Sequence, residues 1–147
     1  MRFVPVKSLE QPAAIAVHRA REHLVRQRTG TINAPRGHLA EYGVVAAALR
    51  GGLNQLFSIV EAEDDNEYVP GRVKQLLRML VAEIRAADAH IAELNRKLKD
   101  NARADEACRR LIGVPGIGPV IATIVVATVP DEQRFSSGRH FAAWLVT

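Results

Sequence analysis

Apolar residues recur in the second half of the chain at alternating spacings of four and three positions. This series runs through Val73, Leu77, Leu80, Ile84, Ala87, Ile91, Leu94 and Leu98. The spacing predicts one long helix with a coiled-coil seam, because such a seam repeats about every 3.5 residues. Leu76 and Ala86 widen the stripe only slightly. The helix therefore needs a partner: the basic helix of this chain, a second copy of the chain, or both.

A first helix is predicted from Leu9, with Ser8 as its N-cap and Gln11 completing a capping box. Its apolar face at helical spacing consists of Leu9, Ala13, Ala16, Val17, Ala20 and Leu24. Before it, residues 1–8 alternate weakly and resemble an extended arm with no partner strand later in the chain.

Glycine and proline interrupt the later part of this helix. Gly30 and Pro35 predict a break or a kink, after which the helix resumes over residues 36–42. Gly43 is suited to end it in the left-handed conformation. Residues 44–60 contain two apolar patches on either side of Gly51-Gly52, a pattern that predicts a short helix, a turn and a second short helix.

Basic side chains border the apolar face of the first helix on both flanks. Arg19, His23 and Arg26 lie on one side, and Arg21 and Arg28 lie on the other. Such a helix lies along phosphates or meets an acidic partner, although a solvated face is an equally good interpretation. Arg19 and Arg26 are taken as candidate nucleic-acid contacts.

The glycine-rich stretch 111–119 is predicted to turn tightly between two helices. Pro115 disfavours helix at the residue before it, and Gly116 and Gly118 are expected to take backbone angles closed to other residues. Pro119 then starts an apolar helix. The turn resembles the hairpin of helix-hairpin-helix DNA-binding elements; a plain turn between two helices is the alternative.

A turn of this kind presents bare N–H groups beside the positive end of a helix, an arrangement that suits a phosphate oxygen. The candidate DNA-binding residues are Gly116, Ile117, Gly118 and Val120, with Arg109 and Arg110 just ahead of the turn. Such contacts hold the backbone of DNA without reading its sequence.

Composition and charge agree with a helical, nucleic-acid-binding chain. Aromatic residues make up 5% of the 147 residues, and the formal net charge is +4. Two basic regions flank an acidic connector, residues 61–67, which is interpreted as a solvated loop in preference to a metal site. The single cysteine, Cys108, excludes an internal disulfide and is expected to pack before the turn. The longest apolar run is too short to cross a membrane, so a cytoplasmic location is expected.

These features predict an all-α fold of long antiparallel or coiled-coil helices followed by a helix-hairpin-helix element. The expected divisions are 1–8, an extended remnant; 9–104, a helical coiled-coil region; and 105–147, the hairpin domain. Ser136 and Ser137 are better explained as a helix cap than as nucleophiles. No catalytic or metal-binding residue is assigned.

Several motifs together resemble one family. R-F-V-P-V-K-S, H-R-A-R-E-H-L-V-R-Q-R-T, L-A-E-Y-G, G-V-P-G-I-G-P and R-F-S-S-G-R-H-F-A-A-W-L occur in this order. They are similar to the insertion-sequence one-ten/one-sixteen/nine-oh-two transposases, relatives of the Piv/MooV DNA invertases. Pro35 departs from the helix-compatible residue usual in I-N-A-x-R-G.

The resemblance implies a RuvC-like nuclease domain with a magnesium-binding Asp-Glu-Asp-Asp cluster, then a coiled coil, then a transposase domain with a catalytic serine. This chain begins after the expected acids and stops before the expected serine, so no catalytic position carries over and no cofactor is expected in the chain itself. The implied partners are DNA and a structured guide RNA.

Three functions compete on these grounds. The first is a transposase segment that binds DNA but cuts nothing alone. The second is a coiled-coil module that forms homo-oligomers or docks onto a full-length transposase. The third, an independent helix-hairpin-helix enzyme, would need a catalytic Asp or Lys near the turn, where Asp131 and Glu132 follow in a loop.

Overall fold

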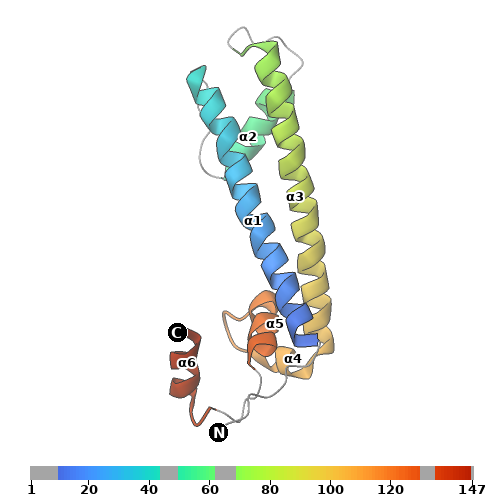
Figure 1. Ribbon diagram of the computed structural model, residues 1–147, viewed down its shortest axis with the longest axis vertical. Coiled ribbons are helices and arrows are strands. Elements are labelled where there is room, and N and C mark those ends of the chain that lie inside the picture. The colour runs from blue at the N-terminus through green and yellow to red at the C-terminus, as the bar shows by residue number, and fades with distance from the viewer. Residues whose placement is uncertain (1–9, 44–49, 62–68, 130–134, 147) are drawn as a thin grey trace. The chain divides into compact units, whose positions relative to one another are not determined.

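The computed structural model describes residues 10–43, 50–61, 69–129 and 135–146, and every regular element in these ranges is an α-helix (Figure 1). The helices are α1 (Glu10–Glu41), α2 (Arg50–Glu61), α3 (Gly71–Ala104), α4 (Glu106–Ile112), α5 (Pro119–Thr128) and α6 (Gly138–Val146). The predicted all-α fold is confirmed. The extended arm predicted for residues 1–8 and most of the acidic connector 61–67 lie outside the described residues.

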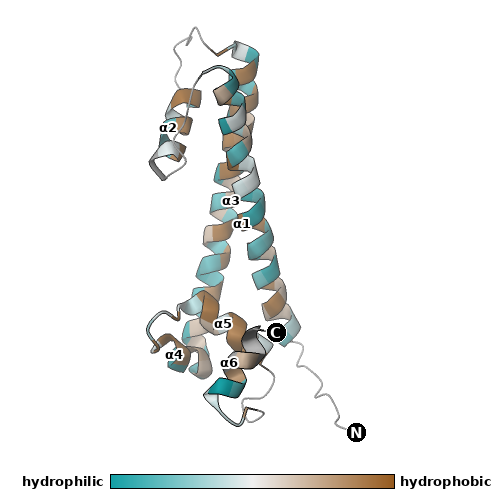
Figure 2. Cartoon of the chain, turned by 90° about the vertical axis from the view of Figure 1, so that its left-hand side faces the viewer, coloured by the Kyte–Doolittle hydropathy of each residue, from teal (hydrophilic) through white to brown (hydrophobic). Residues whose placement is uncertain are grey.

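The chain divides into two compact units, and the divisions fall inside both long helices. One unit comprises residues 1–19 and 95–147, and the other comprises residues 20–94. In the hydropathy colouring, α5 is apolar over most of its length, whereas α1 and α3 alternate between apolar and polar positions (Figure 2). The long helices thus bury one face each, while α5 has an apolar surface on several sides.

In the unit of residues 20–94, α1 and α3 run antiparallel. Arg28 of α1 pairs with Asp88 of α3, and Leu39 further along α1 packs in a cluster with Leu77 and Val81 earlier on α3. All eight positions of the predicted heptad series on α3 are buried or half-buried. The series therefore marks the packed face of α3, and the basic helix of this chain is one partner of that face.

The inward face of α1 differs from the predicted one. Ala13, Ala16 and Ala20 are exposed, whereas Arg21 and Arg28 are half-buried. The long arginine stems cover apolar surface while their charged ends interact with polar groups. Arg21 and Arg28 therefore lie on the packed side of α1, where the sequence pattern predicted a polar flank. The predicted apolar face of the first helix is therefore wrong at its alanines.

The helix α1 is continuous through Gly30 and Pro35, so the break, one of the two predicted outcomes, does not occur. Pro35 is among the most fully buried side chains of the described chain. Tertiary burial on this face offsets the missing backbone N–H of proline, which alone would end the helix. Gly43 has φ +74° and follows the last turn, as predicted for a left-handed helix end.

A core cluster holds α2 against the two long helices. Its buried members are Leu39, Leu56, Val60, Val69, Leu77 and Val81. Gly51 and Gly52 lie in the first turn of α2 and do not form the predicted turn. Leu56 and Val60 are fully buried, and their packing stabilises a helix that the local propensity of two glycines disfavours.

In the other unit, a second cluster joins the end of α3 to α4 and α5. Its buried members are Ala102, Cys108 and Ala122, packed against Leu111, Ile112, Ile117 and Val126. The carboxylate of Asp105 caps α4 by accepting a 2.8 Å hydrogen bond from the backbone N–H of Cys108. Together the cap and the cluster fix the two helices that enclose the glycine turn, residues 113–118.

Candidate nucleic-acid interface

The glycine turn is a tight reversal between α4 and α5. The N–H of Ile117 donates to the carbonyl of Val114 at 3.1 Å, which closes a four-residue turn with Pro115 second and Gly116 third. Gly116 has φ +90°, the value that a type II turn requires at its third residue. Glycine is needed there for its backbone conformation, since an added Cβ would meet no atom within 4 Å.

Gly118 is a different case. Its φ of −93° and ψ of 173° are extended values open to any residue. The prediction that both glycines need special backbone angles is therefore right for Gly116 and wrong for Gly118. No atom lies within 4 Å of a Cβ built at Gly118. This position consequently offers open space beside the start of α5, which is what close approach of a ligand backbone requires.

The first turn of α5 leaves backbone donors without partners inside the helix. Gly118 is the N-cap and supplies no side-chain hydrogen bond, and Pro119 at the first helical position has no N–H to satisfy. The N–H groups of Val120 and Ile121 precede the first possible intrahelical acceptors. These donors coincide with the positive end of the helix dipole, where an anion is stabilised.

Apolar side chains around the glycine turn remain exposed. Val114 is 49% exposed and Ile121 is 47% exposed. Gly113 to Gly116 are exposed as well, while Ile117 is half-buried in the second cluster. The turn thus presents its backbone and two apolar side chains on an accessible surface, while Ile117 packs into the second cluster.

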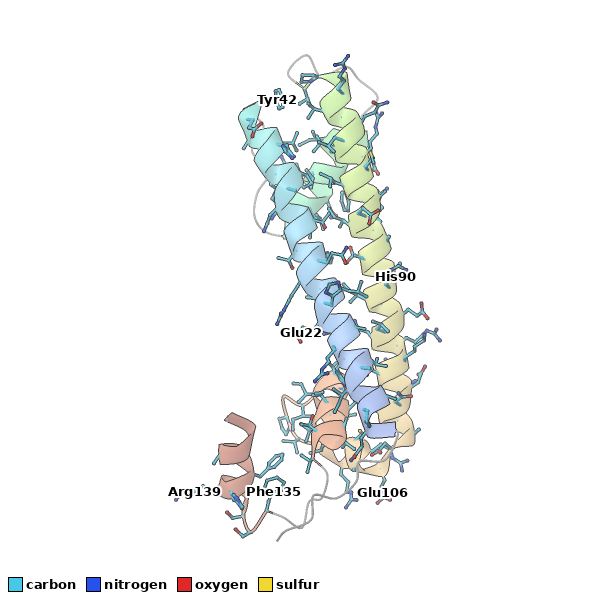
Figure 3. All side chains as sticks on the ribbon, in the orientation of Figure 1. Glu22, Tyr42, His90, Glu106, Phe135 and Arg139 are labelled. Carbon is cyan, nitrogen blue, oxygen red and sulfur yellow. The ribbon has the colours of Figure 1, made fainter. Side chains whose placement is uncertain are left out.

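The two predicted arginines of α4 are both exposed. Arg110 lies 3.9 Å from Glu106, one helical turn earlier, and both side chains are well exposed. Exposed pairs of this kind contribute little to stability, so Arg110 stays available to an anionic ligand. No ion pair of Arg109 occurs within the described ranges. Glu106 is the first residue of α4, whereas the glycine turn follows the last residue of that helix. Figure 3 labels the side chain of Glu106.

The arginines of α1 have different surroundings. Arg19 is exposed and belongs to the same unit as the glycine turn. Arg26 belongs to the other unit, where it pairs with Glu22 on the exposed surface of α1 (Figure 3). The guanidinium of Arg28 donates hydrogen bonds to the carboxylate of Asp88, with Nη2 3.3 Å from Oδ2. The acidic-partner interpretation of the basic helix therefore holds for Arg28.

Two groups with nucleophilic chemistry have structural roles. Cys108 is buried, and desolvation, with the neighbouring Asp105 carboxylate, raises the pKa of its thiol to about 11. The thiol therefore stays protonated near neutral pH and is a poor nucleophile. Ser137 caps α6, its Oγ accepting from the backbone N–H of His140 at 3.2 Å, as predicted.

Around α6, Phe135 packs edge-on against His140 and Phe141, and Arg139 lies in the first turn of α6 (Figure 3). Across the described segments, no group of three or more His, Cys, Asp or Glu side chains is arranged to hold a metal ion. None of the helices described there is long and apolar enough to span a membrane.

One contact near the turn was not predicted. Thr123, in the middle of α5, lies 3.1 Å from Nε2 of His18 on α1. The only signal in the sequence was one of two threonines in a mostly apolar helix, and such a residue has many possible partners. The two side chains are 105 positions apart, so no local pattern connects them.

The fold and the turn define a helical protein that presents a glycine turn, a helix N-terminus and exposed arginines. Comparison with known proteins gives the family. Residues 108–146, which include the turn and α5, match the model of the transposase IS116/IS110/IS902 family. The resemblance of this chain to that family, predicted from its motifs, is confirmed.

Three relatives illustrate the extent of the similarity. A Pseudomonas aeruginosa protein named "Probable family 20 transposase" is 42% identical over 147 residues, 99% of this chain and 43% of that protein. The transposase for insertion sequence element IS1111A of Coxiella burnetii is 34% identical over 145 residues, 99% of this chain and 40% of its own. The transposase for insertion sequence element IS1328 of Yersinia enterocolitica is 30% identical over 143 residues, 97% of this chain and 42% of its own.

This chain therefore spans about two fifths of the length of these relatives. No solved structure matches it.

Proposed function

We propose that this chain serves DNA transposition and site-specific recombination by binding the phosphate backbone of DNA through the glycine turn. The residues assigned to this contact are the backbone of Gly116, Ile117, Gly118 and Val120 and the side chains of Arg109, Arg110 and Arg19. The proposal assigns catalysis to no residue of this chain. It places the protein in the cytoplasm, with magnesium serving only a full-length family member.

The observation that carries the proposal is the geometry at the start of α5. The cap position lacks a side chain and has open space around it. The N–H groups of Val120 and Ile121, which have no acceptor within α5, lie beside it, and α4 places two exposed arginines ahead of the turn. Backbone donors and arginines of this kind bind phosphate oxygens without base contacts, as a protein that holds many DNA sequences requires.

The test is binding of a labelled DNA duplex by the full chain between about 50 and 300 mM salt. Phosphate contacts release counterions, so the logarithm of the binding constant should fall linearly with the logarithm of salt concentration, with a slope near −0.9 for each phosphate neutralised. A Gly118→Leu variant adds bulk without backbone strain and should weaken binding by about tenfold or more, because the phosphate can no longer approach the backbone. A folded protein that binds no duplex, or binds equally well with leucine at position 118, would overturn the proposal.

A structured RNA is the second ligand to include in the same titrations. Its phosphates present the same charge, while its helical grooves differ from those of DNA. Preference for the RNA at matched salt would move the assignment from DNA to a guide RNA.

An exposed apolar pair on α3 favours a second candidate, a module that associates with another copy or with a full-length transposase. Met79 is 68% exposed and Leu76 is 44% exposed, one turn apart and outside the face that packs on α1. Sedimentation at high protein concentration tests it. A monomer that stays monomeric with a full-length relative present would remove this candidate.

A further inference from the structure

The hydroxyl of Thr123 lies in the middle of α5, a helix whose other side chains are apolar except for Thr128 at its last position. The residue is 7% exposed, between the buried Ala122 and the half-buried Ile124. Its Oγ lies 2.8 Å from the carbonyl oxygen of Pro119, 3.2 Å from that of Val120 and 3.1 Å from Nε2 of His18. A buried hydroxyl with three polar neighbours is constrained in ways that a surface threonine is not.

The chemistry of these neighbours decides which group donates. Both carbonyl oxygens can only accept, and the threonine has one proton to give. Donation to the carbonyl of Pro119, the nearest of the three, leaves the lone pairs of Oγ to accept from the Nε2–H of His18. The Nε2-protonated tautomer and the imidazolium both supply that donor. His18 thereby holds Thr123 in one rotamer.

The hydrogen bond joins parts of the chain that the apolar cluster does not join. The members of the second cluster come from the end of α3, from α4, from the glycine turn and from α5. His18 is on α1, and Arg19 follows it directly on the exposed surface. The contact therefore fixes α5 against the first turns of α1, within the unit that holds both.

The position of Thr123 on α5 gives the contact its consequence. Pro119 is four residues earlier, so the carbonyl that receives the hydroxyl proton belongs to the first turn of the helix. That turn carries the N–H groups of Val120 and Ile121. A change in the tilt or rotation of α5 would move these donors relative to Arg19, and a misplacement of about 1 Å is enough to lose well-formed hydrogen bonds.

We propose that His18 and Thr123 are positioning residues for phosphate binding. Their hydrogen bond aligns the donors at the start of α5 with Arg19 of α1, so that both contact one stretch of DNA backbone. The inference rests on the proposed function, since it names the residues that orient the same surface. Neither side chain needs to touch the DNA.

The test is a double-mutant cycle on duplex binding, with Thr123→Val, His18→Leu and the double variant. Valine keeps the shape of threonine and removes the hydroxyl, and leucine removes the imidazole donor. Each single variant should weaken binding by about fivefold to twentyfold, and the double variant should be no weaker than either. The salt slope should fall by about one phosphate, because Arg19 no longer reaches its contact. A His18→Gln variant, whose amide can donate from a similar position, should bind within about threefold of the unmodified chain.

A merely structural role would give a different result. It would lower the unfolding midpoint of both variants and leave the affinity and salt slope of the folded protein unchanged, which overturns the inference. Additive losses in the double variant would also overturn it. Should Thr123→Val fail to fold, His18→Leu and His18→Gln still form a matched pair, since His18 is only half-buried.

The proposed function is tested separately in the same assay. If the unmodified chain binds no duplex, or Gly118→Leu has no effect, the DNA-binding proposal itself fails. If Gly118→Leu weakens binding while Thr123→Val and His18→Leu do not, only the positioning role is lost.

Discussion

Gly118 provides a sharp test of phosphate binding, because aspartate and asparagine at this position differ by one charge and little in shape. The position is the N-cap of α5, its backbone is extended, and a Cβ meets no neighbour within 4 Å. Both substitutes are favoured N-cap residues and accept a hydrogen bond from the N–H of Val120 or Ile121. The two variants should therefore fold like the original chain.

The effects on stability and on binding have opposite signs for the aspartate. Replacing a glycine cap by either residue should raise the free energy of unfolding by a few tenths of a kcal/mol, and the charge of aspartate adds about 0.3–1 kcal/mol through the helix dipole. Against a phosphate about 5 Å away, the same charge costs about 1–3 kcal/mol at the effective dielectric constant of a protein surface. Gly118→Asp should consequently bind DNA roughly tenfold to a hundredfold more weakly than Gly118→Asn.

Fluorescence anisotropy with a labelled duplex measures the affinities, and urea unfolding measures the stabilities of the same preparations. Raising the salt concentration should narrow the difference in affinity, because ions screen the repulsion. Affinities of the aspartate and asparagine variants that equal each other and that of the unmodified chain, in proteins that remain folded, would refute phosphate binding at this helix end.

Three further predictions concern stability. Gly116→Ala should lower the free energy of unfolding by about 1–2 kcal/mol, because the φ of Gly116 is +90°. Gly30→Ala, in the middle of α1, should raise the free energy of unfolding by about 0.5–1 kcal/mol. Thermal unfolding compares the two variants, and effects of the same sign would contradict the turn geometry. Asp88→Asn should lower the free energy of unfolding by about 1 kcal/mol, and by less at high salt, since the ion pair of Asp88 with Arg28 is half-exposed. A denaturant titration that shows no salt-dependent loss of stability would argue against this ion pair. The pKa of the Cys108 thiol is about 11 in the folded state against 9.0 ordinarily, so the unfolded chain loses this proton at lower pH than the folded chain. Stability should therefore decline as pH rises from 9 toward 11. Unfolding curves of Cys108→Ala should show a smaller decline over this range.

The features predicted correctly from the sequence depend on nearby residues. The turn at Pro115-Gly116, the helix start at Pro119 and the left-handed Gly43 follow from backbone preferences within a few positions. The packed face of α3 follows from a heptad series that needs no knowledge of its partner. The family, too, was recognisable because its motifs occur in order along the chain.

The features that were missed depend on tertiary contacts. Pro35 and Gly52 lie inside helices because packing outweighs their local preferences. Arg21 and Arg28 occupy inward positions of α1, where a hydrophobicity pattern expects apolar residues. The hydrogen bond between His18 and Thr123 joins distant positions and has no periodic signature. In each case the deciding partner lies on another helix.

The pair formed by Arg28 and Asp88 has a consequence for how the antiparallel helices find their alignment. Heptad repeats permit neighbouring helices to slide by one repeat with little change in apolar contact. A slip of seven residues toward the start of α3 would bring Arg28 to Val81, which is 3% exposed and has no charge to offer. The misaligned arrangement would bury an unmatched guanidinium, so this single ion pair discriminates among alignments that the leucines and isoleucines alone would accept.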